Sequence, residues 1–343
     1  MKKIIIAMLG ITLIFGLFQY AAAQQFAKVG TAGTQFLKIG AGARNVGMGN
    51  ACIAVVTDAS SVFWNTGALA KVQNYSVFLS HIQWIADIQL NAFSVAKSFP
   101  GIGTFAVSGL FLGSGEMDVT TYQFQEGTGE TFSKNDMSIG ISYSRYLTDK
   151  FSFGGTVKYL REDYGTVNDL TGDDEVASVM AFDVGALYQT GFKSLRMGIS
   201  IQNFGPEMKI PGKYKDIIGF DSKTQTYTTE PADDYRPYHI PLLFRAGVAM
   251  EVIETSKNVI TLAADLVHLN DNVEQVDLGA EYWFNKLVAV RAGYVHNNDT
   301  ARFSAGGSLN LSLSQLGSAS LDYSYSDFGV LDYVNQMSIT FQF

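Results

Sequence analysis

Cysteine and charged residues are both scarce in this sequence. Cys52 is the single cysteine, so no disulfide can form within the chain and a cysteine-based zinc site is excluded. Charged residues make up 16% of the chain, against about 25% in an ordinary soluble domain. The 24 Lys and Arg residues are outnumbered by 32 Asp and Glu residues, so no basic excess is available to neutralise phosphates. We therefore expect no nucleic-acid partner.

Glycine and aromatic residues are abundant instead. The chain contains 34 Gly, 17 Tyr and 24 Phe, and aromatic residues make up 13% of it. A disordered chain would be rich in charge and poor in aromatic residues, so disorder is excluded. This composition is typical of a β protein with few charges, and a length of 343 residues is compatible with one large barrel domain.

Residues 1–23 are predicted to form an export signal that is removed near Ala23. Lys2 and Lys3 precede an apolar stretch over 4–18, and the alanines at 21–23 suit a cleavage site. A membrane anchor is the alternative, but the apolar run is shorter than the about 20 residues of a spanning helix. No later apolar run reaches that length, so a membrane location after export requires a closed barrel. We expect this barrel in the outer membrane.

The last twelve residues alternate between apolar and polar side chains, as a strand with two different faces does. Val334 and Asn335 interrupt the two series. Many outer-membrane barrels end on such a strand with a terminal aromatic residue, which the barrel-assembly machinery reads. We predict that the apolar set is this assembly signal; it comprises Tyr333, Met337, Ile339, Phe341 and Phe343.

Alternation alone also fits a soluble β-sandwich, but three further features favour a membrane barrel. The predicted strands are long, close to the about 9–11 residues that a tilted membrane strand needs. Their polar faces carry Ser, Gly, Asn, Gln and Thr rather than Lys and Glu, as segment 301–314 illustrates. Aromatic residues lie near strand ends, as in interfacial girdles; examples are Tyr75, Trp84, Tyr143, Tyr282 and Trp283. The outer face is then expected to contact outer-membrane lipid.

The pattern predicts an all-β fold in which residues 74–343 form a transmembrane barrel of fourteen antiparallel strands. The long connections 114–134, 163–176 and 205–238 follow the third, fifth and seventh strands, so they share one side of the membrane. Short periplasmic turns and long outer loops are the rule for bacterial barrels. The predicted strands are 74–84, 87–97, 102–113, 135–147, 150–162, 177–189, 195–204, 239–251, 257–268, 273–284, 287–297, 301–312, 316–326 and 332–343.

Residues 24–73 do not read as barrel strands, and we expect them to form a plug, or hatch, inside the lumen. Their glycines let the backbone approach the wall closely, and Asp58 is predicted to cap a short helix over 59–63. A nucleotide-binding loop is rejected, because Asn45 stands where the third glycine of that motif is needed and no Walker lysine follows. Cys52 is predicted to be a small apolar filler.

A run in this segment resembles the N-terminal motif of the PorV/PorQ family, within the wider group of FadL-like outer-membrane barrels. The matching positions are Ala43, Arg44, Gly47, Met48, Gly49, Asp58, Trp64 and Asn65. Thr66 and Gly67 depart from the family, which usually has Pro and Ala there. The segments 126–133 and 147–155 are also similar to this group. The resemblance implies a fourteen-stranded barrel with an N-terminal hatch, in agreement with the strand count.

The resemblance implies two alternative functions. One is that of a type IX secretion component, whose partners are other secretion-system proteins or exported cargo, bound through the outer loops 114–134 and 205–238. The other is a FadL-like channel for long-chain fatty acids or other hydrophobic small molecules. The candidate ligand contacts are Phe63, Trp64, Leu69 and Trp84, although these residues can equally pack the hatch against the wall.

Three polar residues of the predicted plug need partners, because an unpaired buried polar group is costly. Arg44, Asp58 and Asn65 are expected to bond inward-facing groups of the wall, either as a structural network or as substrate contacts. The candidate wall partners are Lys158, Asp183, Arg245, Asp265, Asp277, Glu281, Arg291 and Asp322.

Enzyme activity is not expected, and no catalytic, cofactor-binding or metal site is predicted. The four histidines are scattered, and no G-x-S-x-G nucleophile motif is present. Calcium binding by the acidic run Asp169, Asp173, Asp174 and Glu175 is an alternative to a solvated outer loop, but the run lacks the spacing of an EF-hand.

Overall fold

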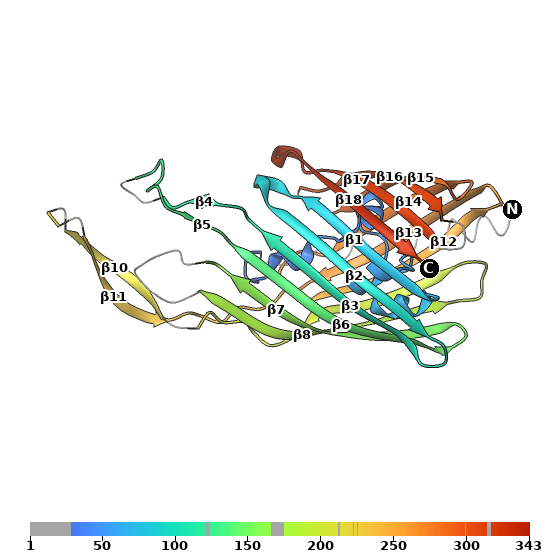
Figure 1. Ribbon diagram of the computed structural model, residues 1–343, viewed down its shortest axis with the longest axis horizontal. Helices are drawn as coiled ribbons and strands as arrows, with labels where there is room; N and C mark the ends of the chain where they lie inside the picture. The colour runs from blue at the N-terminus through green and yellow to red at the C-terminus, as the bar shows by residue number, and fades with distance from the viewer. Residues whose placement is uncertain are drawn as a thin grey trace, which may run out of the picture.

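The computed structural model describes residues 29–120, 124–165, 175–211, 213–221, 223–224, 226–298, 300–313 and 317–343. The main body is a closed antiparallel barrel of fourteen strands, each hydrogen-bonded to two neighbours (Figure 1). Strand β1 pairs with strand β18 to close the ring. The expected export signal lies outside the described residues, and so does the acidic run except for Glu175.

The barrel strands coincide closely with the predicted ones. They are β1 (Tyr75–Gln83), β2 (Gln89–Phe99), β3 (Gly103–Gly113), β6 (Asn135–Thr148), β7 (Phe151–Asp163), β8 (Val176–Gln189), β9 (Arg196–Phe204), β12 (Leu243–Glu254), β13 (Asn258–Leu269), β14 (Gln275–Phe284), β15 (Val288–His296), β16 (Phe303–Ser312), β17 (Ser318–Asp327) and β18 (Tyr333–Gln342). The largest disagreement is at β12, which was expected from residue 239. Pro241 has no N–H for a strand ladder, and His239 pairs with Ala32 instead.

The long connections contain strands that the sequence pattern did not reveal. Connection 114–134 holds the short pair β4 (Met117–Asp118) and β5 (Thr131–Phe132), and connection 205–238 holds β10 (Lys213–Asp221) and β11 (Thr226–Asp234). β10 and β11 form a separate two-stranded sheet that projects beyond one end of the barrel (Figure 1). We call this end the loop end, and the opposite end the turn end. Pro231 lies within β11, opposite Lys215 of β10.

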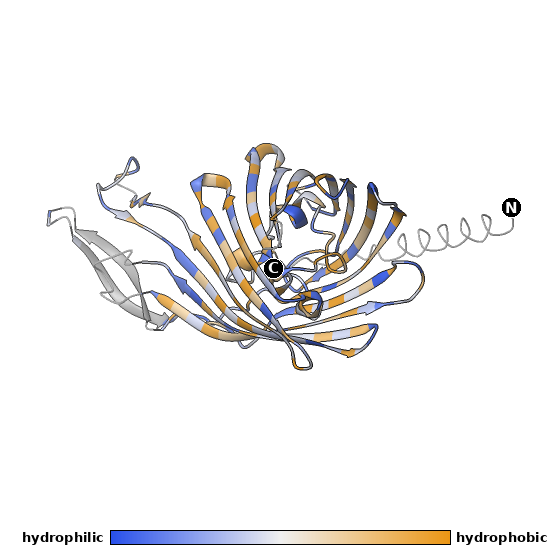
Figure 2. Ribbon diagram, turned by 45° about the vertical axis from the view of Figure 1, so that its right-hand side comes forward, coloured by the Kyte–Doolittle hydropathy of each residue, from blue (hydrophilic) through white to orange (hydrophobic). Residues whose placement is uncertain are grey.

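The wall is apolar outside and largely polar inside, the reverse of a soluble protein. Burial alternates along much of the barrel strands, and outward residues such as Val290 and Met337 are 57% and 58% exposed. Their neighbours on the inner face, such as Arg291 and Ser338, are buried. Figure 2 shows the alternating bands along the strands. Lipid can cover such an outer face. No helix among the described residues is both long and apolar enough to cross a membrane.

Residues 29–73, which we call the inner segment, run through the barrel interior. They form four short helices: η2 (Gln35–Lys38), α2 (Ala43–Gly47), η3 (Ala59–Phe63) and η4 (Thr66–Lys71). Helix α2 packs against β15 to β18, and η4 packs against β6 to β8 on another side of the ring. The predicted cap of η3 is confirmed, because the Asp58 carboxylate accepts the Ser60 N–H at 2.8 Å.

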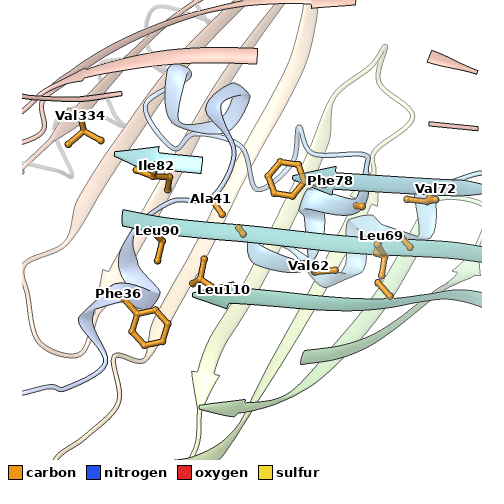
Figure 3. Close-up of a cluster of buried hydrophobic side chains, with 14 of the residues drawn as sticks. Phe36, Ala41, Val62, Leu69, Val72, Phe78, Ile82, Leu90, Leu110 and Val334 are labelled. Atoms are coloured by element: carbon orange, nitrogen blue, oxygen red, sulfur yellow. The ribbon is translucent and has the colours of Figure 1, made fainter. Parts of the chain in front are cut away.

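One sector of the inner wall is apolar. Inward residues of β1 to β3 pack against the inner segment, and Figure 3 shows Phe78, Ile82, Leu90 and Leu110 from these strands. In contrast, the inward faces of β12 to β15 and of β17 carry charged side chains, among them Glu281 and Arg291. The inner segment therefore lies between an apolar sector and a charged sector of the same barrel.

Candidate functional site

Arg44 connects helix α2 to the charged sector. Its Nε lies 2.9 Å from Glu281 Oε2 and its second guanidinium nitrogen lies 2.8 Å from Glu281 Oε1, a two-point ion pair. Arg291 donates to the same carboxylate at 2.6 Å and lies 3.3 Å from Asp322. Burial alone would lower the Arg44 pKa, but the carboxylate of Glu281 outweighs it and holds that pKa above its ordinary value. Arg44 is therefore a permanent cation in this network.

Asp265 of β13 holds the backbone of the inner segment. Its Oδ2 accepts the N–H groups of Cys52 at 2.8 Å and Ile53 at 2.9 Å. The Cys52 side chain is 0% exposed, as expected for an apolar filler. Burial, and next the nearby Asp265 carboxylate, raise the pKa of its thiol well above the ordinary value. The thiol therefore stays protonated and unreactive.

Trp64 and Asn65 are both buried inside the inner segment's packing. The Trp64 Nε1–H donates to the Ala41 carbonyl at 2.8 Å, and the Arg245 guanidinium lies 4.7 Å from the Trp64 ring centre. Asn65 Nδ2 donates to the carbonyls of Ile53 at 2.9 Å and Ala186 at 3.0 Å. Asn65 thereby ties the segment both to itself and to β8.

The small residues of the predicted motif allow backbone-to-wall contact. A Cβ added to Gly293 would lie 1.9 Å from the Gly49 nitrogen, and one added to Gly47 would lie 3.2 Å from Gly306 Cα. Ala43 donates its N–H to Ser338 Oγ at 3.1 Å. Met48, next to these glycines, is fully buried. Any larger side chain at these crossings would push the inner segment off the wall.

Three of the eight candidate wall partners contact the inner segment, namely Glu281, Asp265 and Arg245. Lys158 and Asp183 bond each other and Asn203 within the wall. Arg291 donates to Glu281 and in turn contacts Asp322. Asp277 lies close enough to Asp265 and Arg245 to interact with them electrostatically. The Asp58 carboxylate was expected to bond a wall group, but among the described residues it accepts the Ser60 N–H of its own helix instead.

The four candidate hydrophobic contacts lie in different surroundings. Trp64 and Leu69 are buried in packing, and the Phe63 ring lies 6.0 Å from that of Phe78. Trp84 is different, because it lines a cavity at the loop end and meets Phe328 edge-to-face at 5.0 Å. The ligand role of these residues stays a prediction.

The cavity beside Trp84, which we call the outer cavity, has a volume of about 480 Å³. Its apolar lining includes Phe36, Ile39, Ile82, Leu112 and Phe328, and its polar lining includes Lys38, Lys134 and Asp136. Sequence reasoning identified only Trp84 in this group. A signal was present, because the inward positions nearest the loop end of β1 to β3, namely Ile82, Leu90 and Leu112, are apolar where most of the wall has polar ones.

Within the stretch 40–43 of the inner segment, Gly40 lines the outer cavity and Gly42 lines a smaller cavity on the turn side. That turn-side cavity, of about 130 Å³, is lined by Arg44, Asp58 and Asp322 among others and shares no lining residue with the outer cavity. Besides the Ala43–Ser338 bond, the stretch is held at Ala41 by Trp64 and at Gly40 by Gln336, whose amide lies 3.4 Å from the Gly40 carbonyl.

The predicted assembly signal forms the closing strand. In β18, Met337 and Ile339 face outward, and the Phe343 N–H donates to the Tyr75 carbonyl at 2.9 Å. The side chain of Phe343 is exposed at the turn end. Its recognition by assembly machinery stays a prediction.

The histidines do not converge on a site. His81 contacts Asn91, His268 contacts Glu274 and His239 contacts Glu207, each on a different part of the barrel. Among the described residues, no group of three or more His, Cys, Asp or Glu side chains is placed to hold a metal ion.

Comparison with solved structures shows the fold. The chain is similar to the CymD monoaromatic hydrocarbon channel, with 14% identity, a TM-score of 0.56, and coverage of 89% of this chain and 98% of that one. It is also similar to the P. putida toluene transporter TodX, with 12% identity, a TM-score of 0.60, and coverage of 89% and 99%. For a Pseudomonas aeruginosa FadL homologue the values are 12%, 0.51, 88% and 98%. No curated protein matches the sequence.

The sequence comparison identifies the family. Residues 21–223, more than half of the chain, match the family described as type IX secretion system protein PorV. The matched range includes the inner segment, the first seven barrel strands and strand β10. This family and this fold are those of transport and secretion barrels, which places the chain in an outer membrane. The chain belongs to the PorV family.

Proposed function

We propose that this chain is an outer-membrane component of type IX secretion whose barrel is closed by residues 24–73 acting as a plug. The observation that carries the proposal is the family match over residues 21–223. It is supported by the contacts of the inner segment, which reach β13, β14 and β8 through Cys52, Arg44 and Asn65 respectively. A barrel held shut in this way suits a role in binding partners better than an open pore.

The loop end is the surface on which secretion partners or exported cargo would bind. The β10–β11 sheet has two strands, so each strand has one edge without a partner among the described residues. Exposed strand edges can accept an extended segment of another protein through backbone hydrogen bonds. The connection that carries this sheet is also the longest of the barrel, in agreement with the expected binding role of 205–238.

Deletion of the gene, followed by analysis of the culture medium, tests this proposal. Loss of secreted proteins that wild-type complementation restores is the expected result. A variant in which residues 213–234 are replaced by a short Gly-Ser linker should fold as a barrel yet fail to restore secretion. Heat-modifiable migration on gels checks that the variant barrel is folded. Normal secretion in the deletion strain would contradict the proposal.

The outer cavity favours a second candidate function, the uptake of hydrophobic small molecules. Its volume of about 480 Å³ and its apolar lining are those of a small-molecule site. In the same deletion strain, uptake of a labelled long-chain fatty acid and of a labelled neutral hydrocarbon should be measured. Lost uptake of either compound with normal secretion would favour this channel and contradict the secretion role.

A further inference from the structure

We propose that the outer cavity binds a neutral apolar molecule and rejects molecules of the same size that carry a carboxylate or sulfonate. This inference rests on the second candidate function and names its substrate class. The sequence-based hypothesis named long-chain fatty acids or other hydrophobic compounds as substrates, and this inference selects uncharged compounds among them. The carrying observation is that both lysines at the cavity already have carboxylate partners.

The apolar part of the cavity is built from three separate regions of the chain. Phe36 belongs to the inner segment, Ile82 and Leu112 project inward from β1 and β3, and Phe328 lies at the β17–β18 connection. The edge-to-face contact of Phe328 with Trp84 shapes one wall from two aromatic rings. Aromatic and aliphatic walls of this kind suit a flat hydrocarbon ring system.

The positive charge of Lys38 is neutralised by the carboxylate of Asp271. Its Nζ lies 2.6 Å from both carboxylate oxygens of Asp271, and the side chains of the pair are 21% and 2% exposed. Gln35 also donates to Asp271 at 3.0 Å. Because Asp271 is in direct contact with the Lys38 ammonium group, a ligand carboxylate that approached Lys38 would also be repelled by the negative charge of Asp271.

Lys134 has two carboxylate partners. Its Nζ lies 2.5 Å from Asp136 and 3.4 Å from Glu162, and both carboxylates are buried. Glu162 cannot move aside freely, because it also accepts the Thr34 N–H at 2.9 Å and the Tyr238 hydroxyl at 2.7 Å. Two ammonium groups thus face three carboxylates. An added anion would be repelled, and neither lysine is free to pair with it.

A matched pair of ligands tests the charge rule. Naphthalene-2-sulfonamide and naphthalene-2-sulfonate have the same ring system and nearly the same shape, but only the second is charged. Binding of each to the full-length barrel in lipid nanodiscs is measured by calorimetry and by saturation-transfer NMR. We expect the neutral sulfonamide to bind at least about tenfold more tightly than the sulfonate.

Two variants locate the binding. Ala301→Trp fills the cavity from a connection outside the strands, and Ala305→Trp places the same side chain on the lipid-facing side of β16 as a control. Sulfonamide binding should be lost in the first variant and retained in the second.

Two further variants test the charge rule. Asp136→Asn and Asp271→Asn each remove one carboxylate and should raise sulfonate affinity relative to sulfonamide. Heat-modifiable migration confirms that each variant barrel is folded.

The possible results distinguish a failure of the charge selectivity from the absence of a hydrophobic site in the outer cavity. Equal binding of both ligands to the wild-type barrel, lost in Ala301→Trp, would overturn the charge rule while leaving a hydrophobic site in the cavity. No binding of either ligand, or binding that Ala301→Trp does not change, would overturn both the inference and the uptake function. The secretion proposal stands or falls separately, on the composition of the culture medium.

Discussion

Arg44 and Glu281 lie 237 positions apart in the sequence and form a two-point ion pair inside the barrel, with nitrogen–oxygen distances of 2.9 and 2.8 Å. The pair joins a five-residue helix of the inner segment to strand β14. Glu281 also accepts a hydrogen bond from Arg291, so one carboxylate serves two guanidinium groups. Substitution of Arg44 and substitution of Glu281 should therefore lower the free energy of unfolding by different amounts.

Loss of Glu281 should be more damaging than loss of Arg44. Arg44→Met leaves Glu281 paired with Arg291, so we expect a decrease of about 1.5–3 kcal/mol in the free energy of unfolding. Glu281→Gln leaves Arg44 without a carboxylate partner and leaves the buried Arg291 with Asp322 alone, so we expect a loss of about 3–5 kcal/mol. Urea unfolding of both variants in one detergent measures the difference. Equal losses would show that Arg291 does not support Glu281 as its geometry indicates.

Cys52 is a natural reporter of the contact between Asp265 and the inner segment. Asp265→Ala removes the acceptor of two backbone N–H groups, each such bond being worth about 1.5–3 kcal/mol. Removal of this charge also takes away one of the causes that raise the Cys52 pKa. The rate of thiol labelling at pH 8 should therefore rise at least about tenfold. The comparison variant is Asp277→Ala, which also removes a carboxylate that raises the Cys52 pKa but leaves the backbone bonds to Asp265 in place, so its labelling should rise much less.

Addition of a single methyl group at Gly293 of β15 should disrupt the contact between this strand and the inner segment, and so destabilise the protein. The added carbon in Gly293→Ala would meet the backbone of Gly49, which cannot turn aside as a side chain would. Overpacking of this kind costs about 1–3 kcal/mol. Gly307→Ala is the matched control, because its added carbon has only an ordinary contact at 3.5 Å with the Ala289 carbonyl. Unfolding midpoints of the two variants test the point, and similar values would contradict it.

Lys71 should make stability rise with pH. Burial, and next the nearby charge of Arg196, lower its pKa from 10.5 to about 8 in the folded protein. Between these two pH values the unfolded chain holds a proton on Lys71 that the folded protein has lost. A rise in pH across this window therefore stabilises the folded state. Urea midpoints of wild type and Lys71→Met from pH 7.5 to 10 should converge as pH rises, and a constant difference would refute the shift.

Phe343 should matter for assembly more than for final stability. Its side chain is exposed, whereas its backbone N–H bonds Tyr75 and would persist in Phe343→Ala. We expect less folded barrel in the outer membrane of cells, but an unfolding free energy within about 0.5 kcal/mol of wild type for refolded protein. Leu321→Ala, at an outward position of the neighbouring strand β17 and outside the predicted signal, is the control and should keep normal folded levels. Normal folded levels in cells would remove the assembly role.

Much of the barrel was predictable because strand formation in a membrane wall follows a local rule. Successive side chains of a barrel strand face lipid and lumen in turn, so a few residues of sequence are enough to recognise the alternation in β16 or β18. The Asp58 cap is legible for the same reason, since donor and acceptor are two residues apart. By contrast, the β10–β11 sheet escaped notice because it lies outside the barrel ring, where the alternation between lipid and lumen does not apply.

By itself, then, the sequence determined the all-β class, the number and order of the barrel strands, and the need of Arg44 for a buried partner. Only the tertiary structure decided that this partner is Glu281, that Asp265 binds backbone rather than side chains, and that Phe36, Ile82 and Phe328 share one cavity. Alternation assigns each residue to a face, but the closed ring and its register determine which distant residues meet on that face.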